Sequence, residues 1–119
     1  MYPTVKSGSI VFMKKYNLEL NYNDIVVIKK NDKIIIKRLV GLPNDTIKID
    51  NYLYVNGRQF DNLLTENSGD STDEITLKKD EYFVLGDNRN ESIDSRYNEI
   101  GIINKNEIIG KIILYKKSN

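Results

Sequence analysis

The 119-residue sequence contains no cysteine and no histidine, and these two absences exclude many kinds of active site. Without cysteine there is no disulfide, no thiolate zinc site and no thiol nucleophile. Without histidine there is no Ser-His-Asp triad and no imidazole metal ligand. If the protein is a hydrolase, its general base must therefore be a lysine, an aspartate or a glutamate.

Long apolar runs and a strong net charge are lacking as well. No run approaches the roughly 20 apolar residues that a membrane-spanning helix needs, and no signal peptide opens the chain. Lys and Arg number 18 against 17 Asp and Glu, so no strong field favours a nucleic-acid or acidic partner. The length suits a single domain, residues 1–119, with one hydrophobic core.

Short runs of β-branched and aromatic residues, separated by turn residues, predict the fold class. Asn31-Asp32, Asp50-Asn51 and Asn56-Gly57 are typical of tight turns between strands. Helical periodicity is poor, so we expect an all-β barrel or sandwich of short antiparallel strands. The expected strands are Ser9 to Lys14, Asp24 to Lys29, Lys33 to Leu42, Thr46 to Ile49, Leu53 to Val55, Glu81 to Leu85 and Lys111 to Tyr115.

Three stretches depart from the strand pattern. Residues 62–74 are polar and predict a flexible surface loop. Residues 105–109 can form one helical turn at most. Residues 86–96 are polar too, but they are dense in side chains that can bond to one another, so a structural and a functional interpretation both stay open.

A calcium-binding loop is one functional interpretation of the 86–96 stretch. Asp87, Arg89 and Glu91 occupy the first, third and fifth positions, but arginine cannot ligate a cation and no glycine stands at the sixth. No metal site is therefore expected. The structural interpretation is a self-bonded loop in which Asp94 pairs with Arg89 or Arg96.

Lys37 is unusual because it lies inside a predicted strand. Strand alternation places it on one face with Ile35 and Leu39. Burial there would lower the pKa of the amine and suit it to act as a general base. The plain alternative is a lysine that extends from a barrel wall into solvent.

Three segments together resemble the conserved boxes of bacterial type I signal peptidases, in the same order and at similar spacing. Met1-Tyr2-Pro3-Thr4 is similar to the pattern S-M-x-P-T without its serine. The run from Lys37 to Asp45 resembles K-R-x-x-G-x-P-G-D, with Asn44 in place of glycine. The run from Gly86 to Arg96 matches G-D-N-R-x-x-S-x-D-S-R in full.

The resemblance implies a serine endopeptidase that removes signal peptides from secreted preproteins with a Ser/Lys dyad and no cofactor. It implies that Lys37 is the general base and that Ser92 orients its amine. It also implies that Asp94 and Arg96 form a salt-bridged pair and that Asp87 and Arg89 support the same loop. The candidates for substrate binding are Met1, Val5, Ile34, Ile35 and Ile36, each of which could equally belong to the hydrophobic core.

In the family pattern the nucleophilic serine directly precedes the methionine that Met1 matches. We therefore expect an N-terminally truncated catalytic domain that is inactive as given. The resemblance further implies a membrane anchor upstream of the domain, with a single span and the catalytic domain on the extracytoplasmic side of the cell membrane.

Three other interpretations stay open. One is a non-catalytic signal-peptidase-like accessory protein, as in pilus assembly, although such proteins lose catalytic residues whereas Lys37 and Ser92 are present. Another is the self-cleaving repressor family, which shares a Ser-Lys dyad but does not use the 86–96 box. The third is an inert all-β module with a polar loop.

Overall fold

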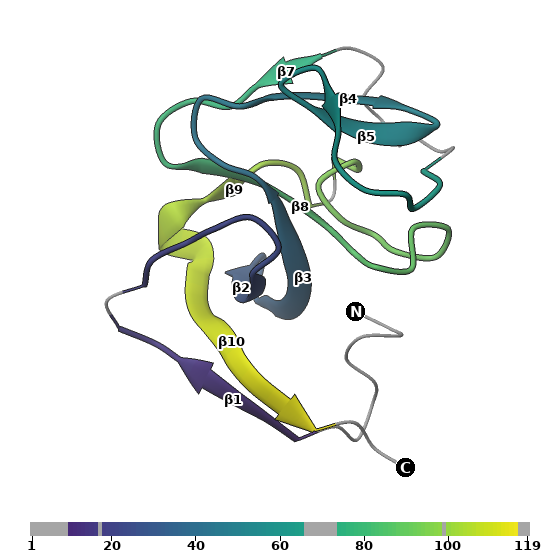
Figure 1. The fold of residues 1–119 in the computed structure, drawn as a ribbon. Helices are drawn as coiled ribbons and strands as arrows, with labels where there is room; N and C mark the ends of the chain where they lie inside the picture. Colours follow the sequence, from purple (N-terminus) through teal and green to yellow (C-terminus); the bar gives the residue numbers. More distant parts are fainter. Residues whose placement is uncertain (1–9, 17, 66–73, 99, 117–119) are drawn as a thin grey trace.

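The structure, a computed structural model, describes residues 10–16, 18–65, 74–98 and 100–116. Within them the regular structure is ten β-strands and one 3-10 turn (Figure 1). The strands form one six-stranded and one four-stranded sheet, and every pair is antiparallel. The predicted all-β class is confirmed, and the described strands do not close into a barrel.

The larger sheet carries the longest strands. Its order is β1 (Ile10–Lys14), β10 (Ile108–Lys116), β2 (Ile25–Lys30), β3 (Lys33–Gly41), β8 (Glu81–Leu85) and β9 (Ile103–Asn104). The turn between β2 and β3 has φ of 52° at Asn31 and 62° at Asp32. Asparagine and aspartate tolerate this left-handed backbone better than other side chains, which explains the tight connection.

The smaller sheet lies beside β3 and β8 (Figure 1). Its order is β6 (Arg58–Gln59), β5 (Tyr52–Val55), β4 (Thr46–Asp50) and β7 (Ile75–Thr76). Asn51, Asn56 and Gly57 have φ of 58°, 54° and 81°, so turn residues with left-handed backbone connect its hairpins.

Two core clusters share a wall made by β3 and β8. Leu39 and Val84 belong to one cluster, whereas Val40 and Phe83 belong to the other. Neighbouring residues of a strand point to opposite faces, so β3 and β8 bury both faces of the sheet. Gly41 ends β3 where a Cβ would approach side chains of the second cluster to 2.9 Å.

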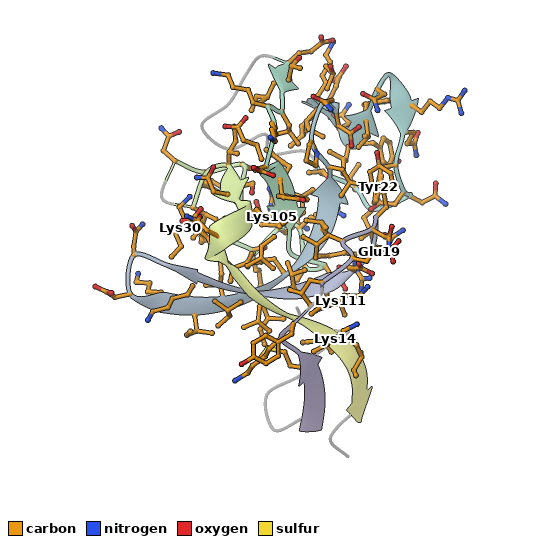
Figure 2. All side chains as sticks on the ribbon, turned by 90° about the vertical axis from the view of Figure 1, so that its left-hand side faces the viewer. Lys14, Glu19, Tyr22, Lys30, Lys105 and Lys111 are labelled. Atoms are coloured by element: carbon orange, nitrogen blue, oxygen red, sulfur yellow. The ribbon has the colours of Figure 1, made fainter. Side chains whose placement is uncertain are left out.

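The segment before β2 is attached to β10 by Lys111. Its side chain lies beside Glu19 (Figure 2), to whose carbonyl its Nζ donates a hydrogen bond of 2.9 Å. The same Nζ lies 3.1 Å from a carboxylate oxygen of Asp24. In the same segment the hydroxyl of Tyr22 donates a hydrogen bond of 2.6 Å to Asp45.

The predicted strands are all present, with differences at their ends. The last strand begins at Ile108, three residues before the predicted start at Lys111. Strands β6, β7 and β9 were not predicted, because two residues carry no detectable alternation. The predicted helical turn is the 3-10 turn Lys105–Glu107.

The predicted surface loop at 62–74 needs one correction. Residues 66–73 lie outside the described part, so their mobility stays a prediction. Thr65 is fully buried, however, because it packs between the smaller sheet and the 86–96 loop. Among the described residues no helix is long and apolar enough to cross a membrane.

Candidate active site

Strand β3 carries Lys37 toward the loop formed by residues 86–96, which follows β8. Lys37 pairs with Val26 of β2, and the register places Ile35 beside Ile28 on the same face. Its Nζ donates a hydrogen bond of 2.9 Å to Oγ of Ser92. The structure therefore brings together Lys37, the expected general base, and Ser92, the residue expected to orient its amine.

The surroundings of Lys37 act on its amine. Burial lowers the pKa of Lys37 below its ordinary value of 10.5 because it disfavours the charged form. Burial is the largest of three influences on this pKa: the negative charge of Asp94 raises it, whereas the positive charge of Arg96 lowers it further. A lowered pKa increases the fraction of neutral amine that can accept a proton.

Gly86 allows Ser92 to approach β3. A Cβ added at Gly86 would collide with the hydroxyl of Ser92, would lie 2.6 Å from its Cβ and would lie 3.5 Å from Nζ of Lys37. Real Cβ atoms essentially never approach another atom to less than 3.0 Å, so both contacts with Ser92 are excluded. The lysine–serine contact therefore needs a residue without a side chain at position 86.

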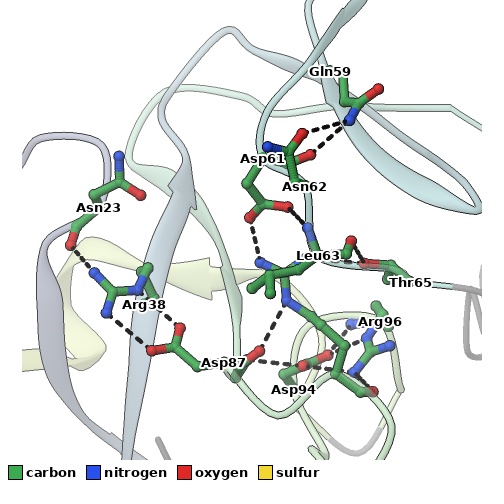
Figure 3. Close-up of polar contacts among 12 residues, drawn as sticks. Asn23, Arg38, Gln59, Asp61, Asn62, Leu63, Thr65, Asp87, Asp94 and Arg96 are labelled. Carbon is green, nitrogen blue, oxygen red and sulfur yellow. Dashed lines mark hydrogen bonds and ion pairs between the residues drawn. The ribbon is translucent and has the colours of Figure 1, made fainter. Parts of the chain in front are cut away.

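Asp94 and Arg96 form a buried ion pair within the 86–96 loop (Figure 3). Both side chains are 0% exposed, and their two parallel hydrogen bonds measure 2.8 and 3.0 Å. Asp94 also accepts a bond from the amide of Gly86, and Arg96 donates to the carbonyls of Arg89 and Ser92. The pair thus fixes the backbone on both sides of Ser92.

Arg89 pairs with Asp61, which lies outside the three sequence boxes, rather than with Asp94. The distance from its Nη2 to Oδ2 of Asp61 is 2.8 Å, and its Nη1 donates to Oγ1 of Thr65 at 2.9 Å (Figure 3). The sequence left Arg89 and Arg96 as possible partners of Asp94, and in the structure the partner is Arg96. No sequence motif pointed to Asp61 or Thr65, because the polar composition of their surroundings predicted a loop.

Asp87 binds Arg38, a residue of the second box that the sequence analysis did not assign. Their two hydrogen bonds measure 2.8 and 3.0 Å, and Arg38 also donates to the carbonyl of Asn23 at 2.8 Å (Figure 3). Arg38 follows Lys37 directly, so this pair joins the strand of the lysine to the loop of the serine. The signal in the sequence that could have predicted this pair is the presence of a basic residue, Arg38, in the second box and an acidic residue, Asp87, in the third.

The three isoleucines before Lys37 are not equivalent. Ile35 is half-buried, shares the face of Lys37 and packs on the main core cluster. Ile36 packs on a separate cluster on the opposite face, and Ile34 is 58% exposed. Met1 and Val5 lie outside the described residues.

Strand β3 pairs with β2 along one edge and with β8 along only part of the other edge. β8 pairs with β3 only from Arg38 onward, whereas β2 pairs along residues 33–38 on the other side. No described strand occupies the remaining edge of residues 33–37. Within the described residues no group of three or more acidic side chains is arranged to hold a metal ion.

Comparison with known proteins identifies a single family. The family model described as signal peptidase, peptidase S26 matches residues 1–115. Signal peptidase I P of Bacillus subtilis subsp. natto is 40% identical, over 92% of this chain and 68% of that protein. Signal peptidase I S of Bacillus subtilis strain 168 is 38% identical, over 97% of this chain and 72% of that protein.

A solved structure gives the same result at the level of the fold. The crystal structure of a signal peptidase I from Enterococcus faecalis V583 superposes with a TM-score of 0.61 and 28% sequence identity, over 79% of this chain and 97% of that one. The all-β architecture and the sequence matches therefore agree, and the chain belongs to the signal peptidase, peptidase S26, family.

Proposed function

We propose that this chain is the catalytic domain of a type I signal peptidase that cuts secreted preproteins with a Ser/Lys dyad. The observation that carries the proposal is the 2.9 Å hydrogen bond between Nζ of Lys37 and Oγ of Ser92, made at a half-buried position. An amine held there has a fixed direction and a lowered pKa, which are the two properties a general base needs.

In the proposed reaction the nucleophile is the serine that precedes Met1 in the family pattern. Neutral Lys37 takes the hydroxyl proton as the serine oxygen attacks the peptide carbonyl. The resulting ammonium gives that proton to the leaving amine, and an acyl-enzyme forms. Lys37 then takes a proton from the attacking water and returns it to the serine when the ester breaks.

Ser92 is a positioning residue in this mechanism. Its hydroxyl oxygen accepts one N–H of Lys37, so the lone pair of the neutral amine is directed elsewhere, toward the nucleophile. The Asp94–Arg96 pair keeps Ser92 in place through the backbone contacts described above.

The substrate is proposed to bind as an extended strand along the edge of residues 33–37 that no described strand occupies, by β-augmentation. Family resemblance assigns small residues to the positions one and three before the cut. Of the isoleucines, Ile35 is best placed to line such a pocket because it shares the face of Lys37. Ile34 and Ile36 point to the other face.

The family resemblance also supports a membrane anchor upstream and an extracytoplasmic catalytic domain. The serine of the pattern is not among the 119 residues. A polypeptide of these residues alone is therefore expected not to cleave, because it has neither the nucleophile nor the serine amide of the oxyanion hole.

The test compares two polypeptides on a peptide that spans a signal-peptide cleavage site. A chain extended upstream through the serine, in detergent, should cleave at the expected bond, and the 119-residue chain should not. Lys37→Ala should reduce kcat by about 10²–10⁴-fold, and Ser92→Ala should reduce it less. Lys29→Ala, which removes an exposed lysine of β2, is the matched control. Full cleavage by the extended Lys37→Ala variant would refute the proposal.

A further inference from the structure

Residues 61–65, which follow β6, hold the 86–96 loop from outside the three sequence boxes. They do so through Arg89, whose side chain is only 3% exposed. Its Nη2 donates to Oδ2 of Asp61 at 2.8 Å, and its Nη1 donates to Oγ1 of Thr65 at 2.9 Å. Its Nε donates to the carbonyl of Gly86 at 2.9 Å. One buried guanidinium thus connects this segment to the backbone of the loop.

The 61–65 segment is itself fixed to the smaller sheet. The amide of Thr65 donates a hydrogen bond of 2.6 Å to the carbonyl of Asn51, in the turn between β4 and β5. Asp61 accepts a bond of 3.0 Å from the amide of Leu63, which orients its carboxylate. Asp61 and Thr65, the two side chains that accept from the guanidinium, are therefore also held by contacts that do not involve Arg89.

At the other end of this connection lies Gly86. Its amide donates to Asp94 at 3.0 Å while its carbonyl accepts from Arg89 at 2.9 Å, so the residue is held from two sides. Ser92 packs directly against it, as the collision of an added Cβ shows. A shift of Gly86 would displace the surface against which Ser92 meets Lys37.

We propose that Asp61 and Thr65 are positioning residues for the Lys37–Ser92 pair and that they act through Arg89 on the carbonyl of Gly86. A buried guanidinium that loses an acceptor must reorient or remain unsatisfied. Reorientation of Arg89 releases the carbonyl of Gly86, and the loop loses one of its two restraints at that residue. The consequence for cleavage rests on the function proposed above, whereas the consequence for the Lys37–Ser92 contact does not.

The competing explanation is that this connection only adds stability. In that case its loss would lower the melting temperature without changing the Lys37–Ser92 contact. The two explanations are separated by measuring that contact directly, in the 119-residue chain and independently of any catalysis.

The first experiment is NMR on the 119-residue chain with labelled lysine and serine. Thr65→Val removes the hydroxyl at nearly constant shape, and Asp61→Asn removes the charge at a side chain that is 25% exposed. Both should weaken the nuclear Overhauser contact between the ε-methylene of Lys37 and the β-methylene of Ser92. Both should also move the pKa of Lys37 back toward 10.5, because water then reaches the amine.

Each variant has a matched control. Thr46→Val removes a hydroxyl that pairs with Thr76 in the same small sheet, at 3.2 Å. Asp24→Asn removes the charge that pairs with Lys111, an ion pair that does not involve Arg89 or Gly86. Thr65→Ser keeps the hydroxyl and should leave the Lys37–Ser92 Overhauser contact as it is in the wild type. If Thr65→Val does not fold, Asp61→Asn carries the test.

The second experiment measures cleavage by the chain extended through the serine. Thr65→Val and Asp61→Asn should lower kcat about tenfold or more with KM little changed, since displacement of a catalytic group on the order of 1 Å can cost about 10²-fold. Unchanged NMR contacts in both variants, with reduced stability alone, would overturn the inference. Changed contacts in the 119-residue chain, with no cleavage by any extended chain, would support the inference and refute the proposed function instead.

Discussion

The amine of Lys37 lies 2.9 Å from the hydroxyl of Ser92, although 55 residues separate the two in the chain. Lys37 is carried by a central strand and Ser92 by a loop that buried and half-buried contacts hold in shape, among them the Asp94–Arg96 pair. Packing alone gives no reason for a lysine and a serine to meet inside a sheet protein. A half-buried lysine that bonds to a hydroxyl is expected where the amine must be neutral and oriented.

The close approach at Gly86 predicts a strong and specific effect of one methyl group. Gly86→Ala should place its Cβ 2.6 Å or less from Ser92 and destabilise the fold by about 1–3 kcal/mol through overpacking. It should also separate Ser92 from Lys37. Urea unfolding measures the first effect, and the Lys37–Ser92 Overhauser contact measures the second.

A double substitution serves as the control for this clash. In the Ser92→Gly background the alanine at position 86 loses the atoms with which it collides. Gly86→Ala should then cost clearly less than it does in the wild type. An equal cost in both backgrounds would mean that the strain lies in the backbone rather than in the contact with Ser92.

The buried ion pair predicts a large loss of stability when one partner is removed. Asp94→Ala leaves the guanidinium of Arg96 buried and uncompensated, which should cost on the order of 3–5 kcal/mol in the free energy of unfolding. Glu91→Ala removes an exposed carboxylate from the same loop, where it accepts one bond from Asn88 at 3.2 Å. It should change stability by less than about 0.5 kcal/mol. Equal melting temperatures for the two variants would contradict this account.

The sequence predicted the strands well where the turn chemistry was strong. Asn31 and Asp32 mark the β2–β3 turn because few other side chains tolerate left-handed backbone at two consecutive positions. The sequence did not predict the start of β10, since Ile108 directly follows the 3-10 turn and its pairing with Ile28 of β2 is not local. Short strands such as β7 exist only because β4 offers them a partner.

The predicted site depended on side-chain types in the three boxes, whereas the contacts between boxes and other segments could not be read from the sequence. Arg89 illustrates the limit. The composition of the 86–96 loop suggested Asp94 as a partner for Arg89. That carboxylate is instead bound by Arg96, which lies only two residues from it in the chain. Arg89 instead reaches Asp61, whose position depends on the packing of the smaller sheet. Long-range pairing of this kind is decided by tertiary structure.

Tyr22 and Asp45 predict a stability effect that disappears at high pH. Asp45 is 7% exposed and accepts bonds from Tyr22 at 2.6 Å, from Leu42 at 2.9 Å and from Asn56 at 2.9 Å. Tyr22→Phe removes one bond to a charged acceptor and should cost about 1.5–3 kcal/mol at neutral pH, toward the lower end because the ring is 42% exposed.

The pH dependence of this effect follows from the hydroxyl. Partial burial, together with the bond to Asp45, raises the pKa of Tyr22 to about 12. A raised folded-state pKa means that the folded protein binds the proton more tightly than the unfolded chain, whose value is 10.0. The difference between wild type and Tyr22→Phe should therefore be full below pH 10 and fall as the pH rises toward 12. Tyr16→Phe, at a residue that is 81% exposed, should leave stability unchanged throughout.

Lys37 predicts the opposite dependence on pH. Burial lowers its pKa in the folded protein, whereas the unfolded chain keeps the ordinary value of 10.5. Between these two values the unfolded state binds more protons, so the free energy of unfolding rises with pH across that window. The contribution of Lys37 is complete above 10.5 and is lost as the pH falls through the lowered pKa.

The measurement is urea unfolding of the 119-residue chain, the Lys37→Met variant and the Lys29→Met variant at a series of pH values up to 10.5. Lys29→Met gives the general effect of losing one positive charge and is subtracted. The remaining difference should move in favour of the wild type as the pH rises, and cleavage by the extended chain should increase over the same range, because both follow the neutral amine. A difference that stays constant with pH would mean that folding leaves the amine in a solvent-like state. Lys37 could not then be neutral often enough to act as the general base, and the proposed dyad would have to be abandoned.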